Sequence, residues 1–302
     1  MPFRPGSAQS ADIRTEPPTR ESPVNGTGLP ETPVLAATAS QAGAASLSHA
    51  GVDRVVAYHS SVYRQRGMPS VAGLLPWASA NEQVSSMIRD VVSGSESTPV
   101  VATVCGNDRM TGVDRMLDLL TEEGAVGVLN APTVGLLEGT VRAVLEAEGL
   151  GRSSEMELLR SARERGLEAW AYVFDASWAR EAVEAGATAL VIHLGITGYG
   201  TGDLRQQARR ACEIAAEAPS GMPVLLHGGD LTSPERFTAL YSELRPLVPG
   251  PLPCGFFGAS AFEAAADPSA AVRSWRRATA MTTTHTRIAS MEMGGCTGDQ
   301  HR

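Results

Sequence analysis

The chain has 302 residues, of which 43% are hydrophobic and 19% charged, so it is globular and long enough for one large domain or two ordinary ones. Its 25 basic and 33 acidic residues give a formal net charge of −8, which argues against nucleic-acid binding. No apolar run approaches the ~18 residues of a membrane span, and the first residues lack the apolar core of a secretion signal, so we expect a cytoplasmic protein without a membrane partner.

Short apolar runs alternate with helical patterns between two polar ends. Residues 1–30 are rich in Pro, Ser, Thr and Gly and are predicted to be a disordered leader, with a similar disordered tail at 279–302. In chain order, strands are predicted at residues 33–40, 53–61, 99–108, 125–133, 168–175, 189–198, 223–230 and 254–260. Helices are predicted between them at residues 42–51, 81–94, 112–124, roughly 134–166, 177–186, 204–218 and 233–247.

This alternation predicts an α/β fold, a single (β/α)8 TIM barrel over residues 31–278. The strands are apolar almost throughout, which is typical of a parallel sheet covered on both faces. A doubly wound open sheet is the alternative. Against it, the first strand lacks a G-x-G-x-x-G turn and the predicted strands number eight.

Polar residues follow the carboxyl ends of the predicted strands, where a barrel of this type carries its active site. The candidate catalytic residues are His59, Cys105, Asp108, His193 and His227. Each histidine can instead be a structural cap, and Cys105 can instead be a small buried residue rather than a nucleophile. Two imidazoles and a carboxylate suit a divalent metal ion, so His193, His227 and Asp108 are the candidate metal ligands if one is bound.

Glycines after the last two strands would present backbone N–H groups at the usual phosphate site of this fold, unless they only form tight turns. The candidate substrate-binding residues are Asn130, Thr133, Thr197, Gly228, Gly229, Gly258, Ala259 and Ser260. The glycine-rich segment 195–203, "GITGYGTGD", is predicted to be a mobile loop able to close over a small-molecule substrate.

All 25 basic residues are arginine, because the chain contains no lysine. Schiff-base chemistry and covalent pyridoxal phosphate (PLP) both need a lysine amine, so both are excluded. The four cysteines are scattered without a CxxC pair, so neither a disulfide framework nor a structural zinc site is predicted.

Several long motifs, in order, resemble the phosphoenolpyruvate hydrolase-like family. They are "AGLLPWASAN", "VCGND", "LNAPTVGLLEGTVRAVLEAEGLG", "AYVFD", "EAGATALVIHLGITG", "LLHGGD" and "GFFGASAFE", and the similarity covers about residues 32–278. Members of this family also form the C-terminal barrel of a tomato virus-resistance protein. The resemblance implies a TIM barrel distantly like phosphoenolpyruvate mutase and phosphonopyruvate hydrolase, acting on small oxo acids. Its pattern includes the candidate substrate-binding residues and also Glu155.

The chain departs from the family pattern beside the expected pocket. It has His59 and Ser61 in a segment where the family typically has Tyr-Asn-Ser-Gly-Arg, and Asn107 and Arg109 flank Asp108 where Thr and Pro are usual. These departures favour a divergent substrate, such as one from specialised metabolism.

Two functions are compatible with the sequence. The first is a lyase or hydrolase that cleaves a C–C or related bond of an oxo-acid-like substrate, with a histidine as general base and glycine-loop amides or a metal holding the oxyanion. The alternative is a ligand-binding or signalling TIM barrel without turnover. The helical excursion after the fourth strand carries apolar residues at helical spacing, and we expect it to pack against another subunit of a homo-oligomer.

Overall fold

The computed structural model describes residues 28–199, 203–248 and 252–294, with side chains through residue 283. Eight parallel strands form a closed barrel in sequence order from β1 to β8, with β1 paired to β8. The strands are β1 Val34–Thr38, β2 Arg54–Ala57, β3 Val100–Val104, β4 Gly127–Asn130, β5 Glu168–Val173, β6 Ala189–His193, β7 Val224–His227 and β8 Cys254–Gly258. The predicted (β/α)8 TIM barrel is confirmed.

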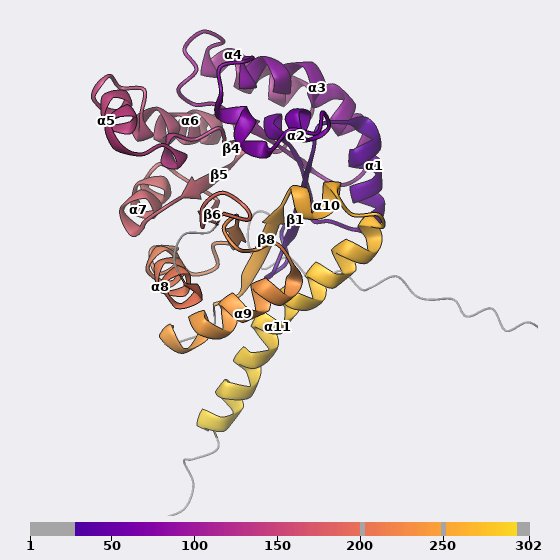
Figure 1. Cartoon of the computed structure of the whole chain (residues 1–302), viewed down its shortest axis with the longest axis vertical. Coiled ribbons are helices and arrows are strands. Elements are labelled where there is room, and N and C mark those ends of the chain that lie inside the picture. Colours follow the sequence, from indigo (N-terminus) through magenta and orange to yellow (C-terminus); the bar gives the residue numbers. More distant parts are fainter. Residues whose placement is uncertain (1–27, 200–202, 249–251, 295–302) are drawn as a thin grey trace, which may run out of the picture.

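Helices surround the strands and cover the outer face of the barrel (Figure 1). The α-helices are α1 Gln41–Ala50, α2 His59–Arg64, α3 Ala80–Gly94, α4 Val113–Glu122, α5 Gly139–Ala147, α6 Arg152–Glu164, α7 Ala176–Glu184, α8 Leu204–Ala215, α9 Pro234–Leu244, α10 Ser260–Glu263 and α11 Pro268–Gly294. Three 3₁₀ turns also occur in the described residues, η1 Ser70–Leu74, η2 Val134–Leu136 and η3 Arg245–Leu247.

The helices form where the sequence supplies an amphipathic stripe and an N-terminal cap. In α4, for example, Met116, Leu117 and Leu120 are buried against the barrel. The side chains of Ser79 and Asp175 accept hydrogen bonds from the first turns of α3 and α7 and so satisfy N–H groups that have no partner within the helix. These caps fix where each helix begins after its strand, and therefore how long each strand-to-helix loop is.

The strands are buried on both faces, as the apolar runs predict. Their register brings residues of neighbouring strands to the same height in the barrel. His193, the last residue of β6, is aligned with His227, the last residue of β7. The two histidines therefore lie side by side at the carboxyl end of the barrel.

The structure differs from the predicted helices in two places. The single helical region predicted at roughly 134–166 is divided into η2, α5 and α6. Gly149, with a positive φ of 68°, separates α5 from α6. The short helix α2 begins directly after β2 at His59, within the segment 53–61 that the apolar pattern predicts to be a strand.

Packed residues also lie outside the predicted boundaries of 31 and 278. Leu29 is fully buried, and α11 continues from the expected end of the barrel into the predicted tail at 279–302 (Figure 1). Thr282 in this helix is buried: its carbonyl accepts from the Tyr241 hydroxyl at 3.0 Å, and its hydroxyl accepts from the Cys254 N–H at 3.3 Å. Most of the predicted leader, residues 1–27, and residues 295–302 lie outside the described residues.

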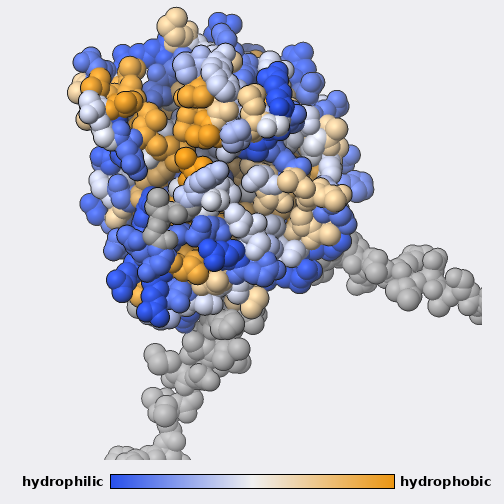
Figure 2. Space-filling model, in the orientation of Figure 1, coloured by the Kyte–Doolittle hydropathy of each residue, from blue (hydrophilic) through white to orange (hydrophobic). Residues whose placement is uncertain are grey.

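The helical excursion after β4 leaves apolar side chains at the surface. No residue of α5 is buried, and Val141 and Val144 are 61% and 53% exposed. Figure 2 shows apolar side chains gathered on the upper left and upper centre of the face it presents. Packing of this excursion against another subunit stays a prediction. Within the part of the chain that the structure describes, no helix has the length and apolar character to span a membrane.

Candidate active site

Two adjoining pockets open at the carboxyl ends of the strands. The first encloses about 480 Å³ and the second about 390 Å³. Both pockets are bordered by Tyr58, Ser70, Thr197 and His227, so together they form one site with two compartments. His59, Thr133, Tyr172 and His193 line the first compartment. Arg64, Gly228, Gly258, Ala259 and Ser260 line the second.

His193 and His227 form the centre of the first compartment. Their ring centroids are 4.9 Å apart, in an edge-to-face arrangement. Aromatic rings enclose the pair: Phe174 stacks on His193 at 5.0 Å, Phe257 stacks on His227 at 4.8 Å, and Tyr172 contacts both histidines. This packing fixes the orientation of both imidazole rings.

The hydrogen-bond partners assign opposite tautomers to the two histidines. The His193 Nδ1 atom accepts a hydrogen bond from the Gly195 N–H at 3.2 Å, so in the neutral ring the proton is on Nε2. The His227 Nδ1 atom lies 2.9 Å from the Phe257 carbonyl oxygen, which can only accept, so Nδ1 carries the proton and Nε2 has the free lone pair. The compartment thus offers one Nε2 donor and one Nε2 acceptor.

Both histidines are held in the neutral state. Burial lowers the pKa of His227 to about 4, against the opposing hydrogen bond to the Phe257 carbonyl, and the charge of Arg64 adds to the lowering. Burial also lowers the pKa of His193 well below its usual value, and His227 and Arg210 act in the same direction. Near pH 7 neither ring carries a charge in the unliganded protein.

His59 reaches the first compartment from the start of α2. Its Nε2 atom is 3.0 Å from the Ser60 hydroxyl, and its Nδ1 atom is buried without a hydrogen-bond partner among the described residues. Burial, with a smaller contribution from the charge of Arg64, lowers the pKa of His59 to about 3. His59 is therefore a neutral side chain that can exchange hydrogen bonds with a ligand.

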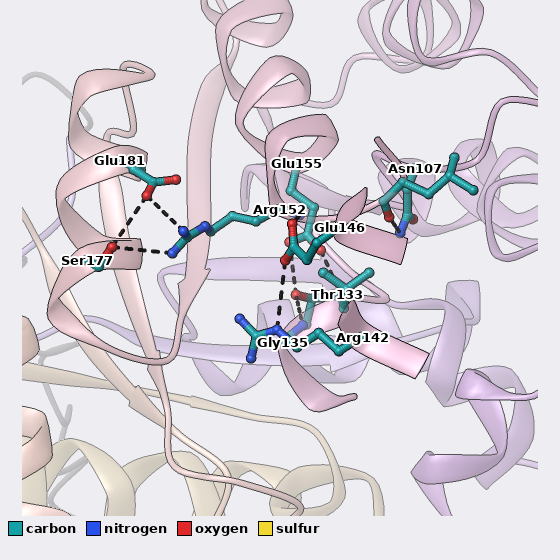
Figure 3. Close-up of polar contacts among 11 residues, drawn as sticks. Asn107, Thr133, Gly135, Arg142, Glu146, Arg152, Glu155, Ser177 and Glu181 are labelled. Atoms are coloured by element: carbon teal, nitrogen blue, oxygen red, sulfur yellow. Dashed lines mark hydrogen bonds and ion pairs between the residues drawn. The ribbon is translucent and has the colours of Figure 1, made fainter. Parts of the chain in front are cut away.

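A buried carboxyl group supports the floor of the site. Glu155 of α6 is fully buried and accepts hydrogen bonds from the Asn130 amide, from the Thr133 hydroxyl at 2.9 Å and from the Val134 N–H at 2.8 Å, as Figure 3 shows for Thr133. Burial raises the pKa of Glu155 to about 7, although these three hydrogen bonds oppose the rise. Glu155 thereby positions Thr133, which lines the first compartment.

Asn130, a candidate substrate-binding residue, takes a structural place instead. It is fully buried and borders neither compartment. Its amide group contacts Glu155, and its carbonyl oxygen accepts from the Tyr172 N–H at 2.6 Å. Asn130 therefore joins β4 to β5 and holds Tyr172 in place beneath the ligand space.

The glycine candidates divide into two groups. Gly228, Gly258, Ala259 and Ser260 border the second compartment, as expected for backbone that approaches a ligand. Gly229 does not, because its N–H donates to the Gly195 carbonyl at 2.8 Å and its carbonyl accepts from the Gly198 N–H at 2.9 Å. Gly229 ties the loop after β7 to the loop after β6. The expected glycine-rich loop 195–203 contains residues 200–202, which lie outside the described residues.

Asp108 does not join the two histidines. Its carboxylate accepts from Ser79, from Met110 N–H and from both the hydroxyl and N–H of Thr111, and these bonds lower its pKa despite the opposing effect of partial burial, which is the largest single contribution. It borders neither compartment. No three His, Cys, Asp or Glu side chains among the described residues form a group that could hold a metal ion. The predicted ligand set Asp108, His193 and His227 is therefore not brought together.

Cys105 is also separate from the site. Its thiol donates to the Asn107 side-chain oxygen at 2.9 Å, and its backbone is held on both sides by Asn81. Burial, assisted by the charges of Asp108 and Glu155, raises the pKa of Cys105 to about 12. The thiol thus lacks the thiolate character that a nucleophile needs, and the alternative of a small buried residue fits its surroundings.

Sequence reasoning did not single out three residues that shape the site. Tyr172 is the last residue but one of β5, and Phe257 the last but one of β8, where their aromatic side chains look like ordinary core. Tyr172 is nonetheless turned to the same interior space as the histidines, since it contacts both rings. Arg64 lies at the end of α2, a helix that the apolar pattern does not predict. A tyrosine near the carboxyl end of a barrel strand is the signal that could have identified Tyr172.

The comparisons with known proteins agree with this architecture. Residues 29–277 match the model of a family described as phosphoenolpyruvate hydrolase-like. The chain belongs to the phosphoenolpyruvate hydrolase-like family. It is 34% identical over 242 residues to the ToMV resistance protein Tm-1(GCR237) of Solanum lycopersicum, covering 76% of this chain and 31% of the tomato protein. It is 28% identical over 219 residues to the putative transcriptional regulatory protein y4pA of Sinorhizobium fredii, covering 69% of this chain and 36% of that protein. The chain thus spans about a third of the length of these two relatives.

Solved structures share the fold at low sequence identity. A phosphoenolpyruvate phosphomutase from Streptomyces platensis subsp. rosaceus superimposes with a TM-score of 0.52 at 15% identity, covering 88% of this chain and 84% of that chain. A 3-hexulose-6-phosphate synthase gives a TM-score of 0.50 at 16% identity, covering 81% of this chain and 99% of that chain. At these identities the likeness shows the barrel fold alone.

Proposed function

We propose that this member of the family is a lyase or hydrolase that cleaves a C–C or related bond of a small oxo acid. The observation that carries the proposal is the pair of buried histidines in opposite tautomers, His193 and His227. A base and a hydrogen-bond donor facing one small compartment are what such a cleavage needs. The family of the chain supports a substrate of the oxo-acid class.

In the proposed reaction, the His227 Nε2 atom takes the proton from a substrate hydroxyl or from an attacking water molecule. In a lyase reaction the deprotonated hydroxyl becomes a carbonyl group as the C–C bond breaks, and the electron pair of that bond forms an enolate with the second carbonyl group. The enolate carbon then takes the proton held by His227. In a hydrolase reaction the water oxygen adds to the carbonyl carbon and the π electrons move to the carbonyl oxygen. The tetrahedral intermediate then collapses, the bond to the leaving group breaks, and the leaving group takes the proton held by His227. In both cases the His193 Nε2–H donates a hydrogen bond to the oxygen that gains negative charge, while the ring stays neutral.

The other groups of the first compartment position the substrate. The Thr133 hydroxyl donates to Glu155 and accepts from the Gly135 N–H, so one lone pair is left for a donor of the substrate, and His59 supplies further hydrogen bonds. The surrounding rings of Tyr172, Phe174 and Phe257 exclude water from the histidine pair, which strengthens each polar contact made there. The mechanism uses no lysine, in keeping with the composition, and no step is assigned to a metal, because the donor set of Asp108, His193 and His227 does not fit one.

A second candidate function is binding without turnover. Two relatives, one a virus-resistance protein and the other a putative transcriptional regulatory protein, favour this function. The test is to incubate the full chain with a panel of small 2-oxo acids and their hydroxylated derivatives and to follow substrate loss by NMR. Turnover that disappears in His227→Gln supports the enzyme. Saturable binding of an oxo acid without product formation supports the binding barrel.

A further inference from the structure

The second compartment carries one full charge. Of the described residues that border the two compartments, Arg64 alone is ionised near neutral pH, since the histidines are neutral and no Asp, Glu or Lys is among them. Gly228 and Gly258 leave part of the wall without side chains. The compartment is therefore a small space with a positive charge and exposed backbone on its sides.

The Arg64 guanidinium is held in place by its surroundings. Its Nε atom donates to Glu263 of α10, and its Nη2 atom donates to the Ser61 hydroxyl at 2.8 Å. The guanidinium also lies over the Tyr58 ring, 5.5 Å from the centroid. These contacts leave the Nη1 group without a hydrogen bond to the described residues. A fixed guanidinium with a remaining N–H edge is well suited to bind a carboxylate or a phosphate.

The position of Arg64 connects this charge to the histidine pair. Tyr58, Thr197 and His227 border both compartments, so a small ligand can extend from Arg64 to the reacting groups without crossing a wall. The charge of Arg64 also acts on the histidines. Burial is the largest cause of the lowered pKa of His59 and of His227, and the positive charge of Arg64 lowers both further. Arg64 is ion-paired with Glu263, which does not border the compartment, so an anionic group would bind the edge of the guanidinium that this pair leaves open.

We infer that Arg64 binds the anionic end of the substrate, a carboxylate or a phosphate, while the reacting carbonyl group lies between His193 and His227. The second half of this statement rests on the proposed function, whereas the binding of an anion by Arg64 does not. Arg64 is thus a specificity-determining residue that restricts the site to acids and rejects neutral ketones and amides of the same size.

The experiment measures anion binding without turnover. The full chain, with ¹⁵N-labelled histidine, is titrated with malonate, inorganic phosphate and neutral malonamide at constant ionic strength and pH 7.5, and the His227 resonance reports binding. We expect saturation with at least one of the two anions and none with malonamide; the anion that saturates identifies the ligand as carboxylate or phosphate. Arg64→Met should weaken that affinity about 10- to 100-fold, since a hydrogen bond to a charged group is lost.

Two further variants make the test specific. Arg66→Met removes an exposed arginine two residues further along and controls for net charge, so its affinity should equal that of the wild type. Glu263→Gln keeps Arg64 but removes the carboxylate that competes for it, so its anion affinity should stay equal or rise, and it remains informative if Arg64→Met does not fold. An affinity that is unchanged in Arg64→Met, weakened in Glu263→Gln, or absent for both anions in the wild type overturns the inference. Absence of turnover with any oxo acid would contradict the proposed function and leave this result standing.

Discussion

His193 and His227 end neighbouring strands at the same register position, and their rings meet edge to face with centroids 4.9 Å apart. A backbone N–H fixes one imidazole and a backbone carbonyl fixes the other. Two side chains of the same type therefore have different chemical roles, because the main-chain groups beside them differ.

The first prediction concerns turnover. His227→Gln and His193→Gln should each lower kcat/KM for the oxo acid that is turned over by roughly 100-fold or more, the usual contribution of a general base or an oxyanion donor. Glutamine is preferable to alanine because both histidines are buried and a truncation would leave a cavity. Steady-state kinetics measures the loss of kcat/KM, and circular dichroism melts show whether each variant is still folded. His49→Gln, on the exposed face of α1, is the control. A variant that is destabilised but active would mean that the histidines are structural caps.

The second prediction concerns acid. The folded-state pKa of His227 is about 4, below its ordinary value of 6.5, so the unfolded chain binds the proton more readily between these values. Stability should therefore fall as the pH decreases from 6.5 to 4, by roughly 3 kcal/mol for this residue. Denaturant unfolding of the wild type and His227→Gln across this range measures the difference. If the two proteins lose stability in parallel, the His227 ring is not held neutral in the folded protein.

The third prediction concerns Glu155 and has the opposite sign. Its folded-state pKa is about 7, above its ordinary value of 4.5, so the unfolded chain releases the proton first as the pH rises. The contribution of Glu155 to the free energy of unfolding, roughly 3 kcal/mol, is fully present below pH 4.5 and is lost as the pH rises to 7. Relative to the wild type, Glu155→Gln should gain about this much between pH 4.5 and 7. Glu157→Gln, an exposed change in the same helix, should show no such gain in the same unfolding series.

The fourth prediction tests the loop after β7. Gly228 has a φ of 75°, and a Cβ atom there would collide with the Gly195 carbonyl and lie 3.2 Å from the His193 ring. Gly228→Ala should therefore lower the unfolding free energy by well over the ~1 kcal/mol of backbone strain and should disturb His193. Gly221→Ala is the matched control, because its φ is 80° and an added Cβ meets no atom of the described residues within 4 Å. Equal melting temperatures of the two variants would contradict the described packing.

The fifth prediction concerns the domain boundaries. A chain of residues 31–278 lacks buried Leu29 and the Thr282 contacts, whereas a chain of residues 28–294 keeps both. The shorter chain should be less stable by at least about 2 kcal/mol, the value of burying one leucine side chain. Urea unfolding of the two chains measures this difference in stability. Equal midpoints would show that the barrel ends at the boundaries predicted from sequence composition.

The barrel was predictable because its signals are local and repeated. Each strand is an apolar run, each helix has a 3.6-residue period, and the polar residues after the strands indicate the active end of the fold. What the sequence does not contain is the direction of each side chain at that end. His227 turns inward, but Asp108 turns back to Ser79 and Thr111, and both positions look alike in the sequence.

The residues inside the site were even harder to predict from the sequence. Glu155 lies 25 residues after Asn130, and only the closed barrel places its carboxyl group below the loop after β4. Tyr172 and Arg64 also reach the site from segments whose local pattern indicates either core or strand. Long-range placement of this kind depends on the packing of complete elements, so a pattern within one segment cannot reveal it.

The aromatic enclosure of the histidines has a spectroscopic consequence. Protons above the face of an aromatic ring experience its ring current and resonate upfield of their usual position. Because Phe174 stacks on His193 and Phe257 stacks on His227, the imidazole C–H signals of these two residues should separate from those of the chain's other four histidines. The fold thus supplies two NMR reporters at the centre of the first compartment, with ring centroids 4.9 Å apart.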